Sequence, residues 1–388
     1  MKITAANLRT ILGFATKVIE KRNTIPVLST VRLVAEGAQL TASGTNLDIQ
    51  IDAWAPLVEA LPTFGEDPFA TCIQCDALYH MLNLMDGETI VELLMENGKP
   101  VFLAPGIRVD EFPHVGKLTD WPEVSILGDP IEWRQDPSFV GTMMSLRPFI
   151  STEETQYYLN GVCLLWDPEA KCSAIVATDG HRLMSRRIEV PEEVAVQRAI
   201  VPSAAVPRWA DVAQNRSVIV TAYSTRNHNR VTGAKEGDPF ITRIRVEAPN
   251  CRMTTKMIEG TYPETWRVIP RGEGLKRATI ERDVLAKSVD CVQEFTPQRS
   301  AAVRFQGKDG VVQLSTDNPD APKVCVEAGS WSGEEHRVGF CRRYLKDALD
   351  AIRSPTVEIE FSDASNPHVL RAPGAHPSDL VVLMPLRL

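Results

Sequence analysis

One pattern occurs three times along this chain of 388 residues and sets the strongest limit on its fold. Each copy has an amphipathic helical segment, a strand, a turn, a second strand and a Thr-Asn or Thr-Asp pair. The threonines of these pairs, Thr45, Thr178 and Thr316, are 133 and 138 residues apart. Solenoid repeats span only about 20–50 residues. The pattern therefore predicts three similar domains.

The first half of each copy begins with a helix whose apolar residues recur at intervals of three and four. We expect these helices over Ala6–Glu20, Phe139–Phe149 and Asp283–Phe295. β-branched and aromatic residues between Gly, Pro and Asp then indicate strands. The strands are expected over Val31–Val34, Leu40–Ile51, Tyr157–Trp166, Ser173–Thr178 and Ala301–Phe305.

The second half of each copy has a short helix followed by a strand. The helices are expected over Asp76–Leu84, Ala204–Ala213 and Tyr344–Ile352, and the strands over Thr89–Met95, Ser217–Tyr223 and Thr356–Phe361. This content predicts an α+β fold of three repeated domains, each with two helices packed on antiparallel sheets. Pro, Gly and charged residues cluster near 121–129 and 270–276, which places the domains at 1–126, 127–271 and 272–388.

Composition limits the class of protein. The chain is 44% hydrophobic and 24% charged, as in an ordinary globular protein. Its net charge of −8 argues against binding nucleic acid over the whole surface but leaves room for local basic patches. No apolar run approaches the roughly 20 residues needed to span a bilayer, and the N-terminus lacks the features of a signal peptide. We expect a cytoplasmic protein without a membrane partner.

Eight cysteines are scattered along the chain, and only Cys72 and Cys75 have metal-ligand spacing. No second pair completes a zinc site, so we expect structural thiols in a strand that enters a helix. The chain also lacks the Gly-rich phosphate loop of nucleotide-binding proteins. Neither a metal nor a cofactor is expected.

The segment Thr178–Leu183 follows the strand Ser173–Thr178 directly. Asp179-Gly180 favours a tight turn with positive φ, because glycine has no Cβ. We expect this turn to present His181, Arg182 and Leu183 at an edge of the sheet. Asp179 and His181 could also share one face, as in a charge relay. Since no nucleophile stands nearby, a hydrogen-bonded turn is the preferred interpretation.

Several motifs together resemble one family. TEETQYYLNGV followed by ATDGHRL is similar to the central domain of the bacterial DNA sliding clamp, the β subunit of DNA polymerase III. GTNLDIQI, EGTYPETWRVIP, VGFCRRYLKDAL and VVLMPLRL resemble other segments of that family, in register with the repeat. The resemblance implies a homodimer in which the first domain of one chain meets the third domain of the other. This ring of six domains would slide on duplex DNA without sequence preference, as a processivity factor with no catalytic site.

The resemblance also implies a peptide-binding groove at the junction of the second and third domains. Its partners would be the catalytic subunit of the replicative polymerase, the clamp loader and other proteins that carry a clamp-binding motif. The groove residues would be Leu159, Thr178, Gly180, His181, Arg182, Leu183, Pro263, Arg267, Val268, Cys341, Tyr344, Val382, Met384, Pro385, Leu386, Arg387 and Leu388. Cys341 stands where the family often has Asn, and Trp266 replaces a usual Tyr.

The sequence of the C-terminal segment, considered without the resemblance, also indicates that the tail docks on the protein surface. The apolar run Leu380–Met384 predicts a strand, and Pro385 stops it from pairing further. We expect Leu386–Leu388 to lie across the surface.

Basic residues on the helices would face the DNA in such a ring. In the first helix, Lys17 and Lys21 lie one turn apart and share a face, with Arg22 just beyond. The second-half helices add Arg208, Arg342, Arg343 and Lys346. Such side chains would contact phosphates without reading bases. Solvated helix faces are the alternative for each residue.

Other positions depart from the family's basic lining. Cys75 and Asp76, Ser203 and Ala204, and Gln156 replace residues that are often basic in the family. These departures leave open a specialised clamp paralogue that binds clamp-motif peptides but loads poorly on DNA.

An enzyme is the third alternative. It would use Asp179 and His181, with Glu153 or Glu154, as acid–base groups. The chain offers no nucleophile motif, metal set or cofactor loop to complete such a site. We therefore expect a non-catalytic protein.

Overall fold

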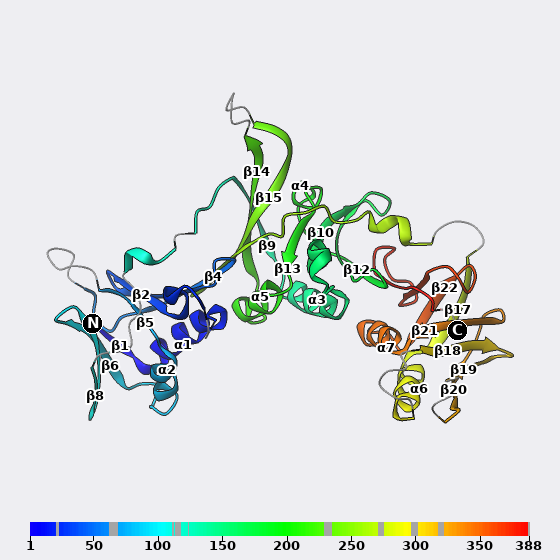
Figure 1. Ribbon diagram of the computed structural model, residues 1–388, viewed down its shortest axis with the longest axis horizontal. Coiled ribbons are helices and arrows are strands. Elements are labelled where there is room, and N and C mark those ends of the chain that lie inside the picture. The colour runs from blue at the N-terminus through cyan, green and yellow to red at the C-terminus, as the bar shows by residue number, and fades with distance from the viewer. Residues whose placement is uncertain are drawn as a thin grey trace. The chain divides into compact units, whose positions relative to one another are not determined.

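A computed structural model describes residues 1–20, 23–61, 69–110, 112, 118–122, 124–228, 235–270, 275–295, 302–316 and 322–386 (Figure 1). The chain divides into two units. Unit 1 contains Met1–Val140 and Ala204–Met257, and unit 2 contains Gly141–Ser203 and Ile258–Leu388. Each unit takes in part of the middle copy of the repeat.

Unit 1 is built on an antiparallel sheet of eight strands in the order β5-β2-β3-β4-β16-β15-β14-β9. A smaller sheet has the order β1-β6-β7-β8. The strands of the large sheet are β2 (Val31–Glu36), β3 (Gln39–Thr45), β4 (Ile49–Pro56), β5 (Ala70–Ile73), β9 (Asp129–Gln135), β14 (Val218–His228), β15 (Lys235–Ala248) and β16 (Cys251–Lys256). Those of the small sheet are β1 (Lys2–Thr4), β6 (Ile90–Glu96), β7 (Lys99–Ala104) and β8 (Ile107–Val109).

The helices of unit 1 begin with α1, which spans Ala5–Ala15. Thr4 caps it by accepting a hydrogen bond from the backbone of Asn7, and its apolar face packs on β3 and β4. A Cβ on Gly44 would lie 2.0 Å from the Ala15 carbonyl oxygen, so only glycine permits this approach. The other helices are α2 (Asp76–Leu82), α5 (Ala205–Ala213) and the 3-10 helices η1 (Thr16–Val18), η2 (Pro26–Ser29) and η3 (Leu118–Asp120).

Unit 2 repeats this plan. Its large antiparallel sheet has the order β13-β10-β11-β12-β24-β23-β22-β17, and its small sheet has the order β20-β19-β18-β21. The large sheet contains β10 (Gly161–Asp167), β11 (Cys172–Thr178), β12 (Arg182–Arg187), β13 (Ala199–Pro202), β17 (Lys276–Glu281), β22 (Thr356–Phe361), β23 (His368–Arg371) and β24 (Leu380–Leu383). The small one contains β18 (Ala302–Lys308), β19 (Val311–Ser315), β20 (Cys325–Ser330) and β21 (His336–Cys341).

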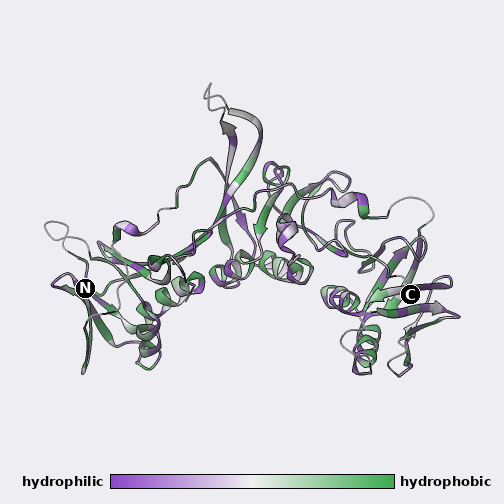
Figure 2. Ribbon diagram, viewed as in Figure 1, coloured by the Kyte–Doolittle hydropathy of each residue, from purple (hydrophilic) through white to green (hydrophobic). Residues whose placement is uncertain are grey.

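The helices of unit 2 include α6 and α7, which pack together. Hydrophobic and hydrophilic residues alternate through the helices and strands of both units (Figure 2), as expected for elements with one buried face. The helices are α4 (Glu192–Ala195), α6 (Arg282–Glu294), α7 (Arg342–Ala351), η4 (Arg147–Phe149), η5 (Glu154–Leu159) and η6 (Thr265–Val268). Helix α3 (Ser138–Leu146) runs from one unit into the other.

The predicted α+β content, the amphipathic helices and the antiparallel pairing are confirmed. Two strand predictions are wrong in their limits. Leu40–Ile51 is two strands, β3 and β4, because the Asn46 side chain accepts hydrogen bonds from the backbone of Asp48 and Ile49 and turns the chain. Tyr157–Leu159 belongs to η5, so the strand expected from Tyr157 begins at Gly161. In the third Thr-Asp pair, Thr316 is buried and Asp317 lies outside the described residues.

The remaining sequence predictions concern cysteines and membranes. Cys72 and Cys75 lie where β5 leads into α2, as predicted, and both are buried free thiols. Burial raises the pKa of Cys72, and it raises the pKa of Cys75 to about 12. Among the described residues, no cluster of side chains could hold a metal ion. None of the described helices is long and apolar enough to cross a membrane.

Candidate peptide-binding and DNA-facing sites

The turn at Thr178–Arg182 is fixed by its own side chains. Thr178 donates its hydroxyl to the Arg182 carbonyl at 2.7 Å, and Asp179 accepts the backbone N–H groups of His181 and Arg182, both at 3.0 Å. Gly180 has a φ of 85° and open space around it. The predicted tight turn is confirmed. Because the Asp179 carboxylate bonds the backbone of His181, the turn is explained without a charge relay.

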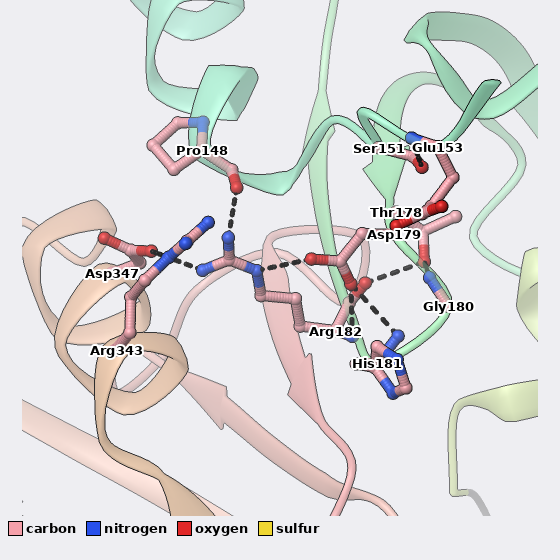
Figure 3. A network of polar contacts seen from close by, with 10 residues as sticks. All are labelled: Pro148, Ser151, Glu153, Thr178, Asp179, Gly180, His181, Arg182, Arg343 and Asp347. Atoms are coloured by element: carbon pink, nitrogen blue, oxygen red, sulfur yellow. Dashed lines mark hydrogen bonds and ion pairs between the residues drawn. The ribbon is translucent and has the colours of Figure 1, made fainter. Parts of the chain in front are cut away.

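Arg182 is at the centre of a polar network (Figure 3). Its Nε donates to Asp179 at 2.9 Å, and its two terminal nitrogens donate to the Asp347 carboxylate and the Pro148 carbonyl. The side chain is only 1% exposed, and β12 lies between β11 and β24. The prediction that Arg182 and Leu183 are presented at a sheet edge is therefore wrong, since both are buried in a central strand.

Two aromatic rings enclose the Arg182 guanidinium. Its central carbon lies 4.3 Å from the centre of the Tyr344 ring and 5.0 Å from that of Phe149. The exposed His181 ring stacks on Tyr344, with 6.2 Å between ring centres and 18° between planes. Partial burial, and then the nearby Asp179 carboxylate, raises the pKa of the Tyr344 phenol. Tyr344 thus links a buried cation to a surface histidine.

The C-terminal strand β24 completes this region. It pairs with β12, so Leu183 lies opposite Val382, and Met384 donates its backbone N–H to the His181 carbonyl at 3.0 Å. Leu386 donates to the Gly339 carbonyl at 2.8 Å. The predicted docking of the tail is confirmed as far as Leu386. Arg387 and Leu388 lie outside the described residues.

The predicted groove residues fall into two groups by burial. Leu159, Leu183 and Val382 lie in one apolar cluster with Trp266 and form a buried base. Thr178 and Arg182 are also buried. The accessible or half-buried members are Gly180, His181, Pro263, Arg267, Val268, Cys341, Tyr344, Met384, Pro385 and Leu386. Exposed Val268, Met384 and Leu386 give this set the apolar character that a short peptide needs.

Unit 1 contains the same backbone arrangement with different side chains. Lys256 donates its backbone N–H to the Asp48 carbonyl at 2.8 Å, as Met384 does to His181. The Lys256 and Asp48 side chains also form an ion pair at 3.2 Å. Gln50 lies opposite Thr254, where unit 2 has Leu183 opposite Val382. At this position of the sheet unit 2 therefore has an apolar pair and unit 1 a polar pair beside an ion pair, while a separate buried cluster of Val27, Leu28, Cys72 and Trp121 lies in unit 1.

Two predicted DNA-facing residues of unit 1 lie within its described part, and both contact a carboxylate. Lys17, in η1, and Arg208, in α5, both form ion pairs with Asp211, and the Arg208–Asp211 distance is 2.7 Å. Lys21 and Arg22 lie outside the described residues. Asp211 reduces the positive charge that Lys17 and Arg208 can offer to a phosphate.

The basic residues of α7 differ in their ion pairs and in the exposure of their side chains. Lys346 pairs with Asp350 at 3.1 Å and with Asp290 at 3.3 Å. Arg343 is 76% exposed and lies 3.9 Å from Asp347, while Arg342 is half-buried. Arg343 is thus the most accessible cation of this group on α7. Asp347 and Asp350 follow Arg343 and Lys346 by four residues, a helical spacing that the sequence itself shows, whereas tertiary packing brings Asp290 of α6 to Lys346.

Comparisons with known proteins identify one family. Three models of the DNA polymerase III beta subunit match in order: the N-terminal domain at residues 1–116, the central domain at 142–264 and the C-terminal domain at 266–387. The beta sliding clamp of Caulobacter vibrioides strain NA1000 / CB15N is 31% identical over 405 residues, with 100% of both chains covered. That of Rickettsia felis is 28% identical and covers 97% of this chain and 96% of its own.

Solved structures agree. The pol III beta structure from Caulobacter crescentus has a TM-score of 0.85 and 30% identity, covering 100% of this chain and 99% of that chain. A sliding clamp from Bartonella birtlesii, bound to griselimycin, shares the fold with a TM-score of 0.83 and 24% identity, covering 100% and 99% of the two chains. Since all three domain models match consecutively and the relatives align from end to end, the chain belongs to the DNA polymerase III beta subunit family, the non-catalytic bacterial sliding clamps.

Proposed function

We propose that this protein is a replication processivity factor of the cytoplasm, in which two chains close head to tail around duplex DNA. The observation that carries the proposal is the consecutive match of all three domains of the family. In this ring the domains are 1–126, 127–271 and 272–388, and the first domain of one chain meets the third of the other. The protein keeps the polymerase at the template by topology.

The ring contacts DNA through the basic residues of its helices. We assign this role to Lys17, Lys21, Arg22, Arg208, Arg342, Arg343 and Lys346. Lys17 and Arg208 both form ion pairs with Asp211, so their electrostatic attraction to phosphates is moderate. The Arg343 side chain is exposed and is more accessible to a phosphate. Weak contacts to phosphates favour sliding, weaken with salt and show no sequence preference.

Partners bind the groove residues of unit 2. The exposed apolar side chains beside the His181–Met384 hydrogen bond support this assignment. The catalytic subunit of the replicative polymerase, the clamp loader and other clamp-motif proteins would present short apolar segments there. A buried base of Leu159, Leu183 and Val382 under accessible Met384 and Tyr344 suits such a ligand.

Retention on circular DNA tests the ring. The protein is incubated with its clamp loader, ATP and a nicked plasmid, and the complex is isolated by gel filtration. We expect the protein to stay with the circle and to be released when a restriction enzyme linearises it. Equal retention on linear DNA, or discrimination between base sequences by more than about 1 kcal/mol per position, would contradict topological, sequence-independent binding.

A further inference from the structure

We propose that Asp347 is a positioning residue of the peptide site, which acts through Arg182 to hold Tyr344 and His181 in place. Asp347 lies in α7 and is not among the groove residues. The inference rests on the proposed peptide-binding function. Asp347 would affect the peptide indirectly, through the buried guanidinium of Arg182.

The charged side chain of Arg182 is buried. A guanidinium removed from water needs hydrogen-bond acceptors, because an unpaired buried donor is costly. Each of its three nitrogens donates to one acceptor, and the acceptors Asp179, Asp347 and the Pro148 carbonyl come from three separate segments (Figure 3). Planar guanidinium groups bind such acceptors in fixed directions. The three acceptors therefore fix the plane of the Arg182 head group.

The Tyr344 ring lies over the guanidinium group of Arg182. Tyr344 lies in α7, three residues before Asp347, and its ring centre is 4.3 Å from the guanidinium carbon of Arg182. Residues three apart in a helix lie on neighbouring positions of one face. Asp347 and Tyr344 thus hold Arg182 from the same helix, one by charge and one by its ring. Fixing the guanidinium fixes the orientation of Tyr344.

Tyr344 in turn contacts His181, which is exposed. The His181 ring stacks on Tyr344, and the His181 carbonyl accepts the N–H of Met384. Without Asp347, Arg182 would keep Asp179 but lose its acceptor in α7. The guanidinium would turn toward water or toward another acceptor, and Tyr344 and His181 would no longer be held in one arrangement. The peptide would then have to order them on binding.

The test measures the affinity of a fluorescein-labelled peptide that carries the clamp-binding segment of the replicative polymerase. It compares wild type, Asp347→Ala, Tyr344→Ala and the double variant of the full-length protein. We expect Asp347→Ala to weaken binding by about tenfold, as for loss of a hydrogen bond to a charged group. In the Tyr344→Ala background the same substitution should have little further effect, because Asp347 acts through that ring.

The matched control is Asp350→Ala, which removes an aspartate one turn along the same helix. Asp350 pairs with Lys346, which also keeps Asp290. Peptide affinity should be unchanged. The second readout is the NMR resonance of the His181 ring, assigned with His181→Gln, which senses the ring current of Tyr344. It should shift in Asp347→Ala and remain in place in Asp350→Ala.

The outcomes separate this inference from the proposed function. If wild type does not bind the peptide, the proposed groove is wrong. If wild type and Asp347→Ala bind equally, or if the losses from Asp347→Ala and Tyr344→Ala add fully, Asp347 has no positioning role. If Asp347→Ala only lowers the melting temperature while affinity and the His181 resonance stay the same, its role is structural. Each of these last results overturns the inference.

Discussion

Met384 donates its backbone N–H to the carbonyl of His181 at 3.0 Å, and this bond joins the C-terminal strand to the Thr178–Arg182 turn. The same bond in unit 1 joins Lys256 to Asp48. The backbone therefore carries two copies of one junction. At this junction unit 2 pairs Leu183 with Val382, where unit 1 pairs Gln50 with Thr254 and adds the Lys256–Asp48 ion pair. The proposed peptide site therefore depends on the side chains at this junction, because both units share its backbone arrangement.

Deleting Met384–Leu388 should abolish peptide binding and leave the homodimer intact. The deletion removes the accessible Met384 and Leu386 side chains and the bond to His181, while β24 retains its pairing with β12. Fluorescence polarisation with the labelled polymerase peptide measures affinity, and sedimentation velocity measures the dimer. Unchanged peptide affinity, or a dissociated dimer, would show that the tail has another role.

Replacing Asp211 with Asn should strengthen retention of the loaded ring on DNA. Asp211 pairs with both Lys17 and Arg208, so its removal frees two cations for phosphates. Each added phosphate contact makes the slope of log affinity against log salt more negative by about 0.9. The half-life of the ring on nicked circular DNA, followed from about 50 to 200 mM salt, measures this effect. Asp290→Asn is a control on α6, since Lys346 keeps Asp350. A shorter half-life for Asp211→Asn would mean that its ion pairs hold the site together.

The sequence was sufficient to predict elements whose signal is local. Helices α1, α6 and α7 follow from apolar residues at intervals of three and four, and the turn at Asp179-Gly180 follows from side chains within three residues. The turn at Asn46 was missed because Leu47 and Ile49 continue an apolar pattern, although Leu47 adopts a φ of 77°.

Long-range pairing explains what the sequence could not predict. Arg182 looked like a surface residue after a turn, but its acceptors at Pro148 and Asp347 are 34 and 165 positions away. The charge of a residue does not reveal whether tertiary packing will supply a partner. For the same reason, the ion pair between Lys17 and Asp211, which are 194 positions apart, could not be predicted from the sequence.

Replacing Phe295 with Ser should weaken the proposed homodimer. Helices α1, α3 and α6 each begin one copy of the repeat, and an apolar residue lies within three positions of each helix end: Val18, Phe149 and Phe295. Val18 and Phe149 are 6% and 0% exposed, whereas Phe295 is 53% exposed. A second chain would cover Phe295 in the ring. We expect the dissociation constant, from sedimentation equilibrium, to rise about tenfold or more, since burying a Phe side chain contributes about 1.5–3 kcal/mol.

The control for this prediction is Val284→Ser, which removes another exposed apolar side chain of α6. The dimer should be unaffected by that change. Equal dimerisation of wild type and Phe295→Ser would remove Phe295 from the interface.

The buried pair His336 and His368 should make the stability of unit 2 depend on pH. Their Nε2 atoms lie 2.8 Å apart, so at least one ring is neutral and accepts the hydrogen bond. Burial, and then Lys276, lowers the pKa of His336 to about 4. Burial, and then His336, lowers that of His368 to about 4. An unfolded histidine has a pKa of about 6.5.

The sign follows from the protons bound in each state. Between about pH 6.5 and 4 the unfolded chain binds more protons at these two positions than the folded chain, so the free energy of unfolding falls as pH falls. The slope is at most about 1.4 kcal/mol per pH unit for each histidine. Urea unfolding at pH 7.5, 6.0 and 5.0 measures it. In His336→Phe/His368→Phe the slope should decrease, whatever the absolute stability of the variant. The exposed His80→Gln is the control and should keep the wild-type slope. If the double variant also keeps that slope, the pH dependence comes from carboxylates and not from the histidine pair.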